Sequence, residues 1–236
     1  MAQVYGEYVK GFRVPSYLEI EKKYQLLCTD ICELTKKLSY AGEHRVVDDY
    51  FDTIDGQFYQ DGVFIRIRNQ SSLDIKFNPD HLGKSNVSEH VSCHEYSFRE
   101  PFQETDSPLF KSLESLINFR LPTGVSFQSF LDANNLRPFI AIDKIRQTYT
   151  NELYNVVVDH IKNLGVFMEV EYSGPQDEDL QLEGILAGID TLMKDIPATP
   201  LSTGCFEMIL RQENFDLYKK GKYLLEGDRP EKIKGA

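Results

Sequence analysis

The chain of 236 residues has no tryptophan, only four cysteines and five histidines, and no long apolar run. No stretch approaches the roughly 20 apolar residues that a membrane-spanning helix needs. Residues 1–5 lack the basic and apolar regions of a secretory signal. Four irregularly spaced cysteines are too few for a disulfide framework in a chain of this length. The sequence therefore predicts a reduced, cytoplasmic protein with no attachment to a membrane.

Positive charge is also scarce, with 26 lysines and arginines against 37 aspartates and glutamates and a formal net charge of -11. Proteins that bind nucleic acid without sequence preference need clustered surface cations, so no nucleic-acid partner is expected. The length suits one domain with a sizeable core. We expect a single domain over residues 1–217, followed by a flexible tail over residues 218–236 that is rich in lysine and glycine.

The sequence does contain short segments in which charged and apolar residues alternate. In the first of them, Glu19, Glu21 and Lys23 occupy alternate positions of a predicted strand and therefore share one face. An apolar core has no use for three charges on one surface. A site that holds a divalent metal against phosphate oxygens needs both signs of charge close together. This segment is the first candidate for a functional site.

The same alternation occurs four more times along the chain. In each case it places a pair of charges on one face: Arg66 with Arg68, Asp74 with Lys76, Lys144 with Arg146, and Glu169 with Glu171. One such strand alone would ordinarily turn its apolar face to the core and its charged face to water. Five together are explained more simply by an α+β fold, in which a closed antiparallel β-barrel has a charged lumen and helices packed on its outside.

Periodicity and turn signals divide the rest of the chain into further elements. Strands are expected at residues 45–53, 63–69, 73–78, 92–99, 139–150, 153–161 and 166–173. Helices are expected at residues 25–38, 107–119, 126–136, 177–194 and 204–214.

Six elements, in this order, resemble the CYTH superfamily, also called the triphosphate tunnel metalloenzymes. They are Glu-x-Glu-x-Lys at residues 19–23, Tyr50-Phe51-Asp52, the Arg-Ile-Arg strand at residues 66–68, the strand with Lys76, Lys144-x-Arg146-x-x-Tyr149, and the segment from Asp159 to Glu171. The last segment is similar to the class IV adenylate cyclase branch of the superfamily. The matching elements extend from about residue 19 to about residue 210, which is most of the chain.

The resemblance implies a metal-dependent enzyme that binds a triphosphate-bearing small molecule, such as ATP or a polyphosphate, inside the barrel. It implies Mg2+ or Mn2+ as the cofactor, held by an acidic set that consists of Glu19, Glu21, Asp159, Glu169 and Glu171, with Glu95 as a further supporting acid. The triphosphate would lie against Lys23, Arg66, Arg68, Lys76, Lys144 and Arg146. Of these, Lys23, Lys76 and Arg146 are the candidates for catalysis.

Two reactions suit such a site, because both depend chiefly on positioning and charge neutralisation. The branch resemblance favours conversion of ATP to cyclic AMP and pyrophosphate. The alternative is a triphosphatase that hydrolyses inorganic triphosphate, a nucleoside triphosphate or thiamine triphosphate. Two positions depart from the family pattern: Cys93-His94-Glu95 replaces the usual Arg-x-Glu, which removes one cation, and Cys205-Phe206 replaces a frequent Ser-Tyr pair.

A third possibility is a module that binds polyphosphate or a nucleotide without turnover. The four glutamates of the expected metal site, Glu19, Glu21, Glu169 and Glu171, argue against such a module, because anion binding alone needs no acid cluster beside the cations. Both a monomer and a homodimer are compatible with a barrel that has no open edge.

Overall fold

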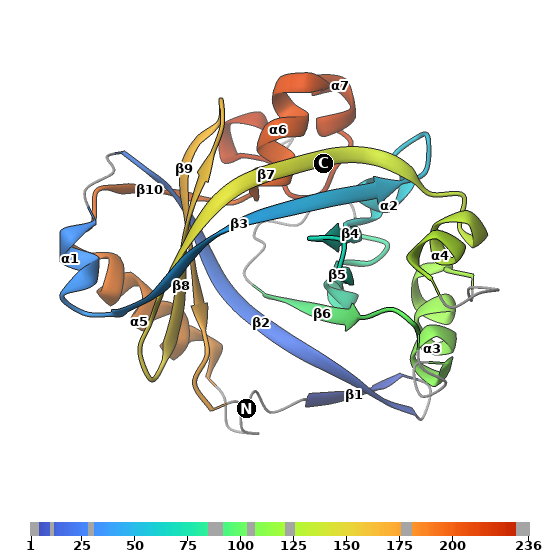
Figure 1. Cartoon of the computed structure of the whole chain (residues 1–236), viewed down its shortest axis with the longest axis horizontal. Coiled ribbons are helices and arrows are strands. Elements are labelled where there is room, and N and C mark those ends of the chain that lie inside the picture. The colour runs from blue at the N-terminus through green and yellow to red at the C-terminus, as the bar shows by residue number, and fades with distance from the viewer. Residues whose placement is uncertain are drawn as a thin grey trace, which may run out of the picture.

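The chain is described by a computed structural model, which covers residues 5–9, 12–27, 31–84, 92–102, 107–120, 126–175 and 181–229. The strands of the barrel are β2 (Phe12–Leu26), β3 (Ser39–Asp52), β4 (Phe64–Arg68), β5 (Ser72–Phe77), β6 (Ser92–Phe98), β7 (Arg137–Thr150), β8 (Tyr154–Ile161) and β9 (Gly165–Tyr172). They follow one another in the order β2-β6-β5-β4-β3-β7-β8-β9, and β9 pairs with β2 again (Figure 1). The predicted closed antiparallel barrel is confirmed.

Two short strands extend this sheet. β1 (Tyr5–Val9) and β10 (Ala198–Leu201) both pair with β2, at opposite ends of that strand. The helices are α1 (Cys32–Thr35), α2 (Gln57–Asp61), α3 (Ser107–Ile117), α4 (Phe127–Ala133), α5 (Leu182–Met193), α6 (Cys205–Glu213) and α7 (Phe215–Tyr218). Short 3-10 turns lie at Pro79–His81 and Glu226–Asp228.

Alternation along the strands sorts their side chains between the lumen and the outside. In β4, Ile65 and Ile67 are buried in a core that also contains Leu113 of α3 and Phe130 of α4. The intervening Arg66 lines the cavity inside the barrel. A second core lies between α5 and strands β2, β8 and β9. Where a strand has an apolar outer face, as β4 and β9 do, the helices bury that face and the charged inner face is left to the lumen.

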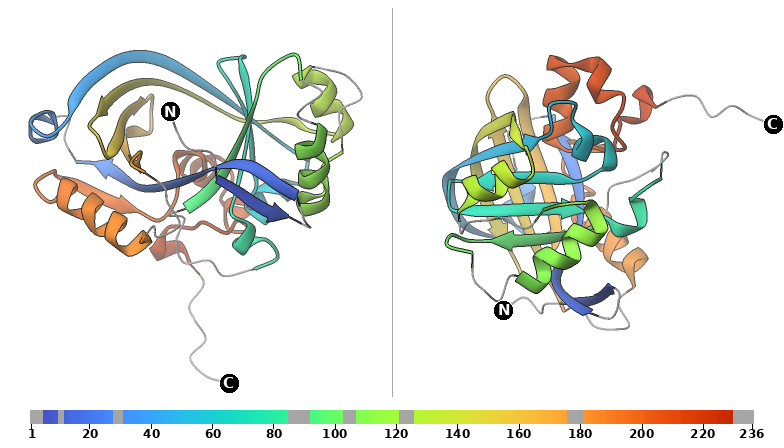
Figure 2. Two further views of the ribbon diagram at one scale, coloured as in Figure 1. Left: turned by 90° about the horizontal axis from the view of Figure 1, so that it is seen from below. Right: turned by 90° about the vertical axis from the view of Figure 1, so that its right-hand side faces the viewer.

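The helices cover only part of the outside. Figure 2 shows α3 and α4 on one side of the barrel and α5 on another. Within the described ranges, part of the outer face of β3 and β7 has no helix over it, and there Arg45 and Asp143 are exposed and Ile145 is 41% exposed. None of the helices in the described ranges combines the length and the apolarity that crossing a bilayer requires.

One end of the lumen is closed by the C-terminal elements. Phe64 and Phe167, which belong to barrel strands, share an apolar cluster with Phe206 of α6, Tyr218 of α7 and Tyr223 beyond it. The prediction of a flexible tail from residue 218 is wrong up to residue 229, because Tyr218 and Tyr223 are 0% and 2% exposed. The Tyr223 hydroxyl also contacts His81 Nδ1 at 3.0 Å. Residues 230–236 lie outside the described part of the chain.

The helix predicted at residues 25–38 is also wrong in most of its length. Among the described residues of this range, β2 continues through Leu26 and only Cys32–Thr35 is helical. Tyr24 and Leu26 continue the alternating burial of β2, and β10 pairs with β2 over residues 23–26. Pairing with a neighbouring strand thus outweighs the helical spacing of the leucines. The other predicted helices are present, although residues 177–180 of the acidic one lie outside the described residues.

Candidate active site in the barrel lumen

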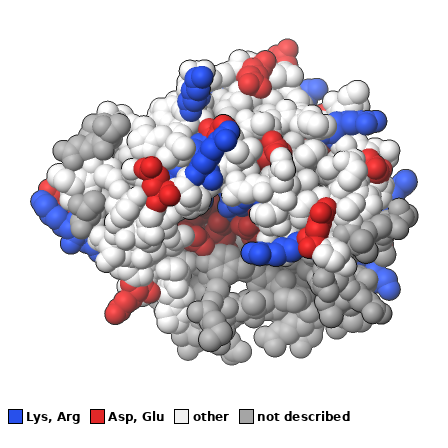
Figure 3. Space-filling view, in the orientation of Figure 1, with Lys and Arg blue, Asp and Glu red and all other residues white. Residues whose placement is uncertain are grey.

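A cavity of about 450 Å³ lies inside the barrel. In the space-filling view, acidic and basic atoms meet in a hollow near the middle of the molecule (Figure 3). The cavity is lined by all the predicted cations, Lys23, Arg66, Arg68, Lys76, Lys144 and Arg146, and by the glutamates Glu19, Glu21, Glu95, Glu169, Glu171 and Glu207. The barrel therefore brings together every cation and every glutamate that the sequence assigned to the site.

The strand register places opposite charges beside each other. Lys23 of β2 lies opposite Glu169 of β9, and Lys76 of β5 lies opposite Glu95 of β6. Directly opposite residues on one face are close enough for their side chains to interact. The Lys76 Nζ bonds Glu95 Oε2 at 2.6 Å and Glu19 Oε2 at 2.7 Å. Lys76 is thus neutralised by carboxylates of two other strands, β2 and β6.

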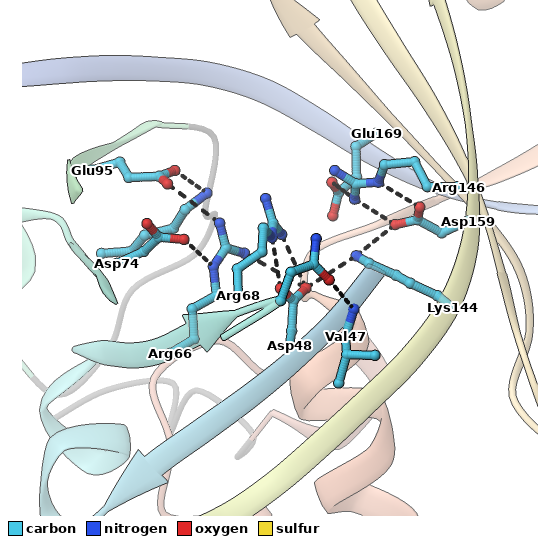
Figure 4. Close-up of polar contacts among 12 residues, drawn as sticks. Val47, Asp48, Arg66, Arg68, Asp74, Glu95, Lys144, Arg146, Asp159 and Glu169 are labelled. Atoms are coloured by element: carbon cyan, nitrogen blue, oxygen red, sulfur yellow. Dashed lines mark hydrogen bonds and ion pairs between the residues drawn. The ribbon is translucent and has the colours of Figure 1, made fainter. Parts of the chain in front are cut away.

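Three aspartates form a buried layer behind the cations (Figure 4). Asp48, Asp74 and Asp159 are 1%, 2% and 1% exposed, and none of them lines the cavity. Asp48 accepts two hydrogen bonds from Arg68, at 2.7 and 3.0 Å. Asp74 accepts one from Arg66 Nε at 2.9 Å. Such contacts fix the guanidinium planes before any ligand arrives.

Burial alone would raise the pKa of Asp48. The hydrogen bond from Arg68 and the positive charges of Arg66 and Lys144 nevertheless hold this pKa well below its usual range. Asp48 is therefore an anion at neutral pH, and it offsets part of the repulsion among the cations around it.

Asp159 belongs to the predicted metal-binding set, but the structure places it in this buried layer. Its oxygens accept two hydrogen bonds from Arg146, at 2.7 and 2.6 Å, and one from Lys144 at 2.8 Å. In this arrangement Asp159 contacts cations and does not face the cavity.

The glutamates that do face the cavity differ in their protonation. Burial would raise the pKa of Glu19, but the charges of Lys76 and Lys23 lower it to about 2. The pKa of Glu169 is held far below its usual range, despite burial, chiefly by Arg146. Glu21 bonds Lys23, yet burial and the charges of Glu19 and Glu169 raise its pKa to about 7. The raised pKa of Glu21 therefore reflects repulsion from the neighbouring carboxylates, in addition to burial.

Carboxylate oxygens are the donors that Mg2+ and Mn2+ prefer. A divalent cation between Glu19, Glu21 and Glu169 would relieve the repulsion that raises the pKa of Glu21, so the residues present suit such an ion. Within the described ranges no three acids, thiols or imidazoles already converge in a metal-binding arrangement. The reason is that Glu19, Glu21 and Glu169 each turn to a cationic side chain.

Three lumen or near-lumen acids, Asp48, Asp74 and Glu207, were given no role in the site predicted from the sequence. Asp74 and Asp48 share the strand face of Lys76 and Tyr50 respectively, so the period of two already indicated where they point. Glu207 lies in the first turn of α6, where no alternation marks it. At Cys93, which departs from the family pattern, the thiol donates a hydrogen bond to Glu19 Oε2 at 3.1 Å.

Comparisons with known proteins agree with this architecture. No curated protein matches the chain in sequence. Among solved structures, the chain is similar to the PH1819 protein from Pyrococcus horikoshii OT3, with 15% identity and a TM-score of 0.54, over 82% of this chain and 99% of that chain. It is also similar to a candidate adenylate cyclase from Vibrio parahaemolyticus, with 15% identity and a TM-score of 0.53, over 81% of this chain and 97% of that chain. At such identities these likenesses show the fold alone.

A match in sequence, and not the likeness in fold, identifies the family of the chain. Residues 18–183 match the CYTH domain. This span begins in β2, ends in α5 and contains all six cations that line the lumen. Since this span is well over half of the chain, the protein belongs to the CYTH domain family.

Proposed function

We propose that the chain is a metal-dependent enzyme that binds ATP in the barrel lumen and converts it to cyclic AMP and pyrophosphate. The observation that supports the proposal is the charge arrangement of the cavity. Cations from β2, β4, β5 and β7 face glutamates from β2, β6 and β9 around one space of about 450 Å³. Proteins of this family are in general metal-dependent.

A triphosphate carries about four negative charges at neutral pH, and it leaves water only where fixed cations replace its hydration. The lumen has these cations already oriented by buried aspartates, so they need little reorganisation when the ligand binds. The arginines offer forked donors to phosphate oxygens, and the lysines act as compact charges.

The proposed metal ligands are Glu19, Glu21, Glu169 and Glu171, because all four line the cavity. A bound Mg2+ or Mn2+ would neutralise phosphate oxygens and help to orient them. We assign Asp159 a different role from the one expected from the sequence. Its hydrogen bonds to Lys144 and Arg146 position these two cations toward the triphosphate. Lys23, Lys76 and Arg146 remain the candidates for stabilising the charge that develops at phosphorus.

An organic part of the substrate is favoured by the apolar part of the lining. Tyr50, Phe64, Ile142, Val157 and Phe206 line the cavity beside the charged residues. The rings of Tyr50 and Phe206 lie 4.7 Å apart, centroid to centroid. Inorganic triphosphate would gain nothing from this surface, whereas the base and ribose of a nucleotide would bury apolar area against it.

A triphosphatase is the second candidate, and the environment of Cys93 favours it. The thiol faces Glu19 at a position where an arginine is usual in the family, so the lumen holds one cation fewer than the family pattern implies. A triphosphate that is gripped at fewer points could present its terminal phosphorus to water. Substrates for this reaction would be inorganic triphosphate, a nucleoside triphosphate or thiamine triphosphate.

Product analysis tests the proposal. The purified chain is incubated with ATP, and separately with inorganic triphosphate, in Mg2+, in Mn2+ and in excess chelator. We expect cyclic AMP and pyrophosphate from ATP in equal amounts, and no product in chelator. Orthophosphate from either substrate would establish the triphosphatase instead. Tight triphosphate binding without turnover would contradict both reactions and leave a binding module.

Changing Arg66 to alanine tests the strand assignment. Arg66 lines the cavity and is 7% exposed, so its loss should raise the KM for the triphosphate and also slow turnover. The matched control is Arg45→Ala on the uncovered face of β3, where the guanidinium bonds Asp143 outside the barrel. Steady-state kinetics of both variants decide the question. Equal kinetics for the two variants would mean that the lumen cations do not bind the substrate.

A further inference from the structure

Glu207 is a lumen residue to which neither the sequence nor the proposed metal site assigns a role. It lies in the first turn of α6, is 2% exposed and lines the cavity. Its Oε2 accepts the backbone N–H of Gly204 at 3.0 Å, which caps the helix. Its Oε1 has no hydrogen-bond partner in the part of the chain that the structure describes.

This carboxyl differs from the glutamates on the opposite walls. Glu19, Glu95 and Glu169 each contact a lysine or an arginine within 3.3 Å. Glu207 has no such contact among the described residues, and the nearby Lys23 bonds Glu21. A buried carboxylate without a cationic partner costs much free energy, which is avoided if the group holds a proton. Accordingly, burial raises the pKa of Glu207 to about 7, although Lys23 and the backbone of α6 oppose the shift.

We propose that Glu207 is a proton donor to the polyphosphate leaving group, with its Oε1 hydroxyl directed at a phosphate oxygen beside the N-terminus of α6. The inference rests on the proposed function, since it requires a triphosphate in the lumen. A neutral acid adds no negative charge beside the substrate, and the N-terminal end of α6 favours an anion there. Gly204, the N-cap of this helix, and Cys205, its first residue, also line the cavity.

The proton and the electrons balance in the step. The ribose 3'-oxygen forms a bond to the α-phosphorus while the bond from that phosphorus to the bridging oxygen breaks. The electron pair of the broken bond stays on the pyrophosphate, which takes the proton of Glu207. The 3'-hydroxyl releases one proton, and the Glu207 carboxylate regains one from solvent. In the triphosphatase reaction, water replaces the 3'-hydroxyl and the γ-phosphorus replaces the α-phosphorus.

Asp52 offers a matched control, because it is a buried carboxyl with a capping role alone. It is 3% exposed, it accepts backbone N–H groups of Phe58 and Tyr59 at 3.0 and 2.8 Å, and it does not line the cavity. Both of its oxygens are used in these bonds, whereas Glu207 uses one. Comparison of Glu207→Gln with Asp52→Asn therefore separates a lumen role from helix capping.

Turnover is the first measurement. Glutamine keeps the shape of Glu207 and an oxygen that can accept the Gly204 N–H, but it cannot transfer a proton. We expect Glu207→Gln to lower kcat by about 100-fold with little change in KM, the scale usual for loss of a general acid. Asp52→Asn should leave both constants near their wild-type values. Wild-type kcat in Glu207→Gln would overturn the assignment.

Proton uptake is the second measurement and needs no turnover. Inorganic triphosphate is titrated calorimetrically into each protein at about pH 8 with chelator, in two buffers of different ionisation enthalpy. The titratable groups that face Glu207 are Lys23 of β2, Tyr59 of α2 and Tyr223 of the C-terminal segment. All three are retained in the variant, so the difference between the two proteins reports on Glu207.

At about pH 8 the Glu207 carboxyl is mostly ionised before triphosphate binds. The arriving anion raises the pKa of Glu207, so that the carboxylate takes up a proton. The wild type should therefore take up about one proton more than Glu207→Gln on binding. Equal uptake by the two proteins would overturn the inference and leave the proposed function intact. Failure of both proteins to bind triphosphate would overturn the proposed function, and this inference with it.

Discussion

Replacement of Asp48 by asparagine is expected to lower the free energy of unfolding by about 3–5 kcal/mol, the usual loss when one partner of a buried ion pair is removed. Asp48 is 1% exposed and accepts two hydrogen bonds from Arg68. Lys144 Nζ and Arg66 Nη1 lie 3.5 and 3.9 Å from its Oδ2. Asparagine has nearly the same volume but no charge, so the buried Arg66 and Lys144 and the partly buried Arg68 lose a common counter-ion. Denaturant unfolding with unchanged m-values measures the loss.

The matched control is Asp143→Asn. Asp143 also accepts two hydrogen bonds from an arginine on a neighbouring strand, Arg45, at 2.8 and 2.6 Å. Both of these residues are exposed, however, and water screens exposed ion pairs. We expect no resolvable change in stability for this variant. Equal losses in the two variants would show that burial in the lumen does not decide the strength of the Asp48 contacts.

The lowered pKa of Asp48 also determines how the stability difference between the wild type and Asp48→Asn depends on pH. Because its cationic neighbours lower the folded-state pKa of Asp48, its stabilising contribution is present above the unfolded value of 3.8 and is lost as the pH falls toward the folded value. The stability gap between the wild type and Asp48→Asn should therefore stay constant from about pH 8 to about pH 5. Below about pH 4 it should shrink. A gap that grew on acidification would contradict the assignment.

The barrel could be predicted because every one of its charged strands alternates. Residues such as Arg66 and Ile65 differ so much in polarity that the period of two also determines which face is which. The sequence could not say which acids touch which cations, because pairs such as Lys76 with Glu19 are 57 residues apart in the chain. Asp159 illustrates the limit: its strand face was predictable, but its depth behind Lys144 and Arg146 depends on the register of β7 and β8.

Both errors in the element assignment have a tertiary cause. Residues 25–38 have leucines at helical spacing, but β10, more than 170 residues further along the chain, pairs with the end of β2. Residues 219–229 look polar and glycine-rich, but Tyr223 and Leu224 fill the apolar end of the lumen. Neither partner is visible from local sequence. Glu207 was missed for a related reason, since only the position of α6 over that end of the barrel turns its first turn toward the cavity.

Replacement of Glu21 by glutamine should remove metal-dependent turnover while making the metal-free protein more stable. Glu21 lines the cavity and is a proposed metal ligand, and even residues that only support a metal ligand affect metal affinity or activity by 10- to 100-fold. We therefore expect turnover to fall by more than about 100-fold. Titration with Mn2+, followed by electron paramagnetic resonance without substrate, should show weaker binding. The control is Glu43→Gln on the outer side of β3, where the carboxylate accepts a hydrogen bond from Gln147.

The gain in stability follows from the sign of the pKa shift. Burial and the charges of Glu19 and Glu169 raise the folded-state pKa of Glu21 from 4.5 to about 7. Its contribution to stability is therefore lost as the pH rises from about 4.5 through 7, and at about pH 8 the ionised carboxylate opposes folding. Glutamine carries no charge, so thermal unfolding at about pH 8 in chelator should occur at a higher temperature than in the wild type. A variant that lost both turnover and stability would have lost its fold, whereas one with normal Mn2+ affinity and turnover would exclude Glu21 from the metal site.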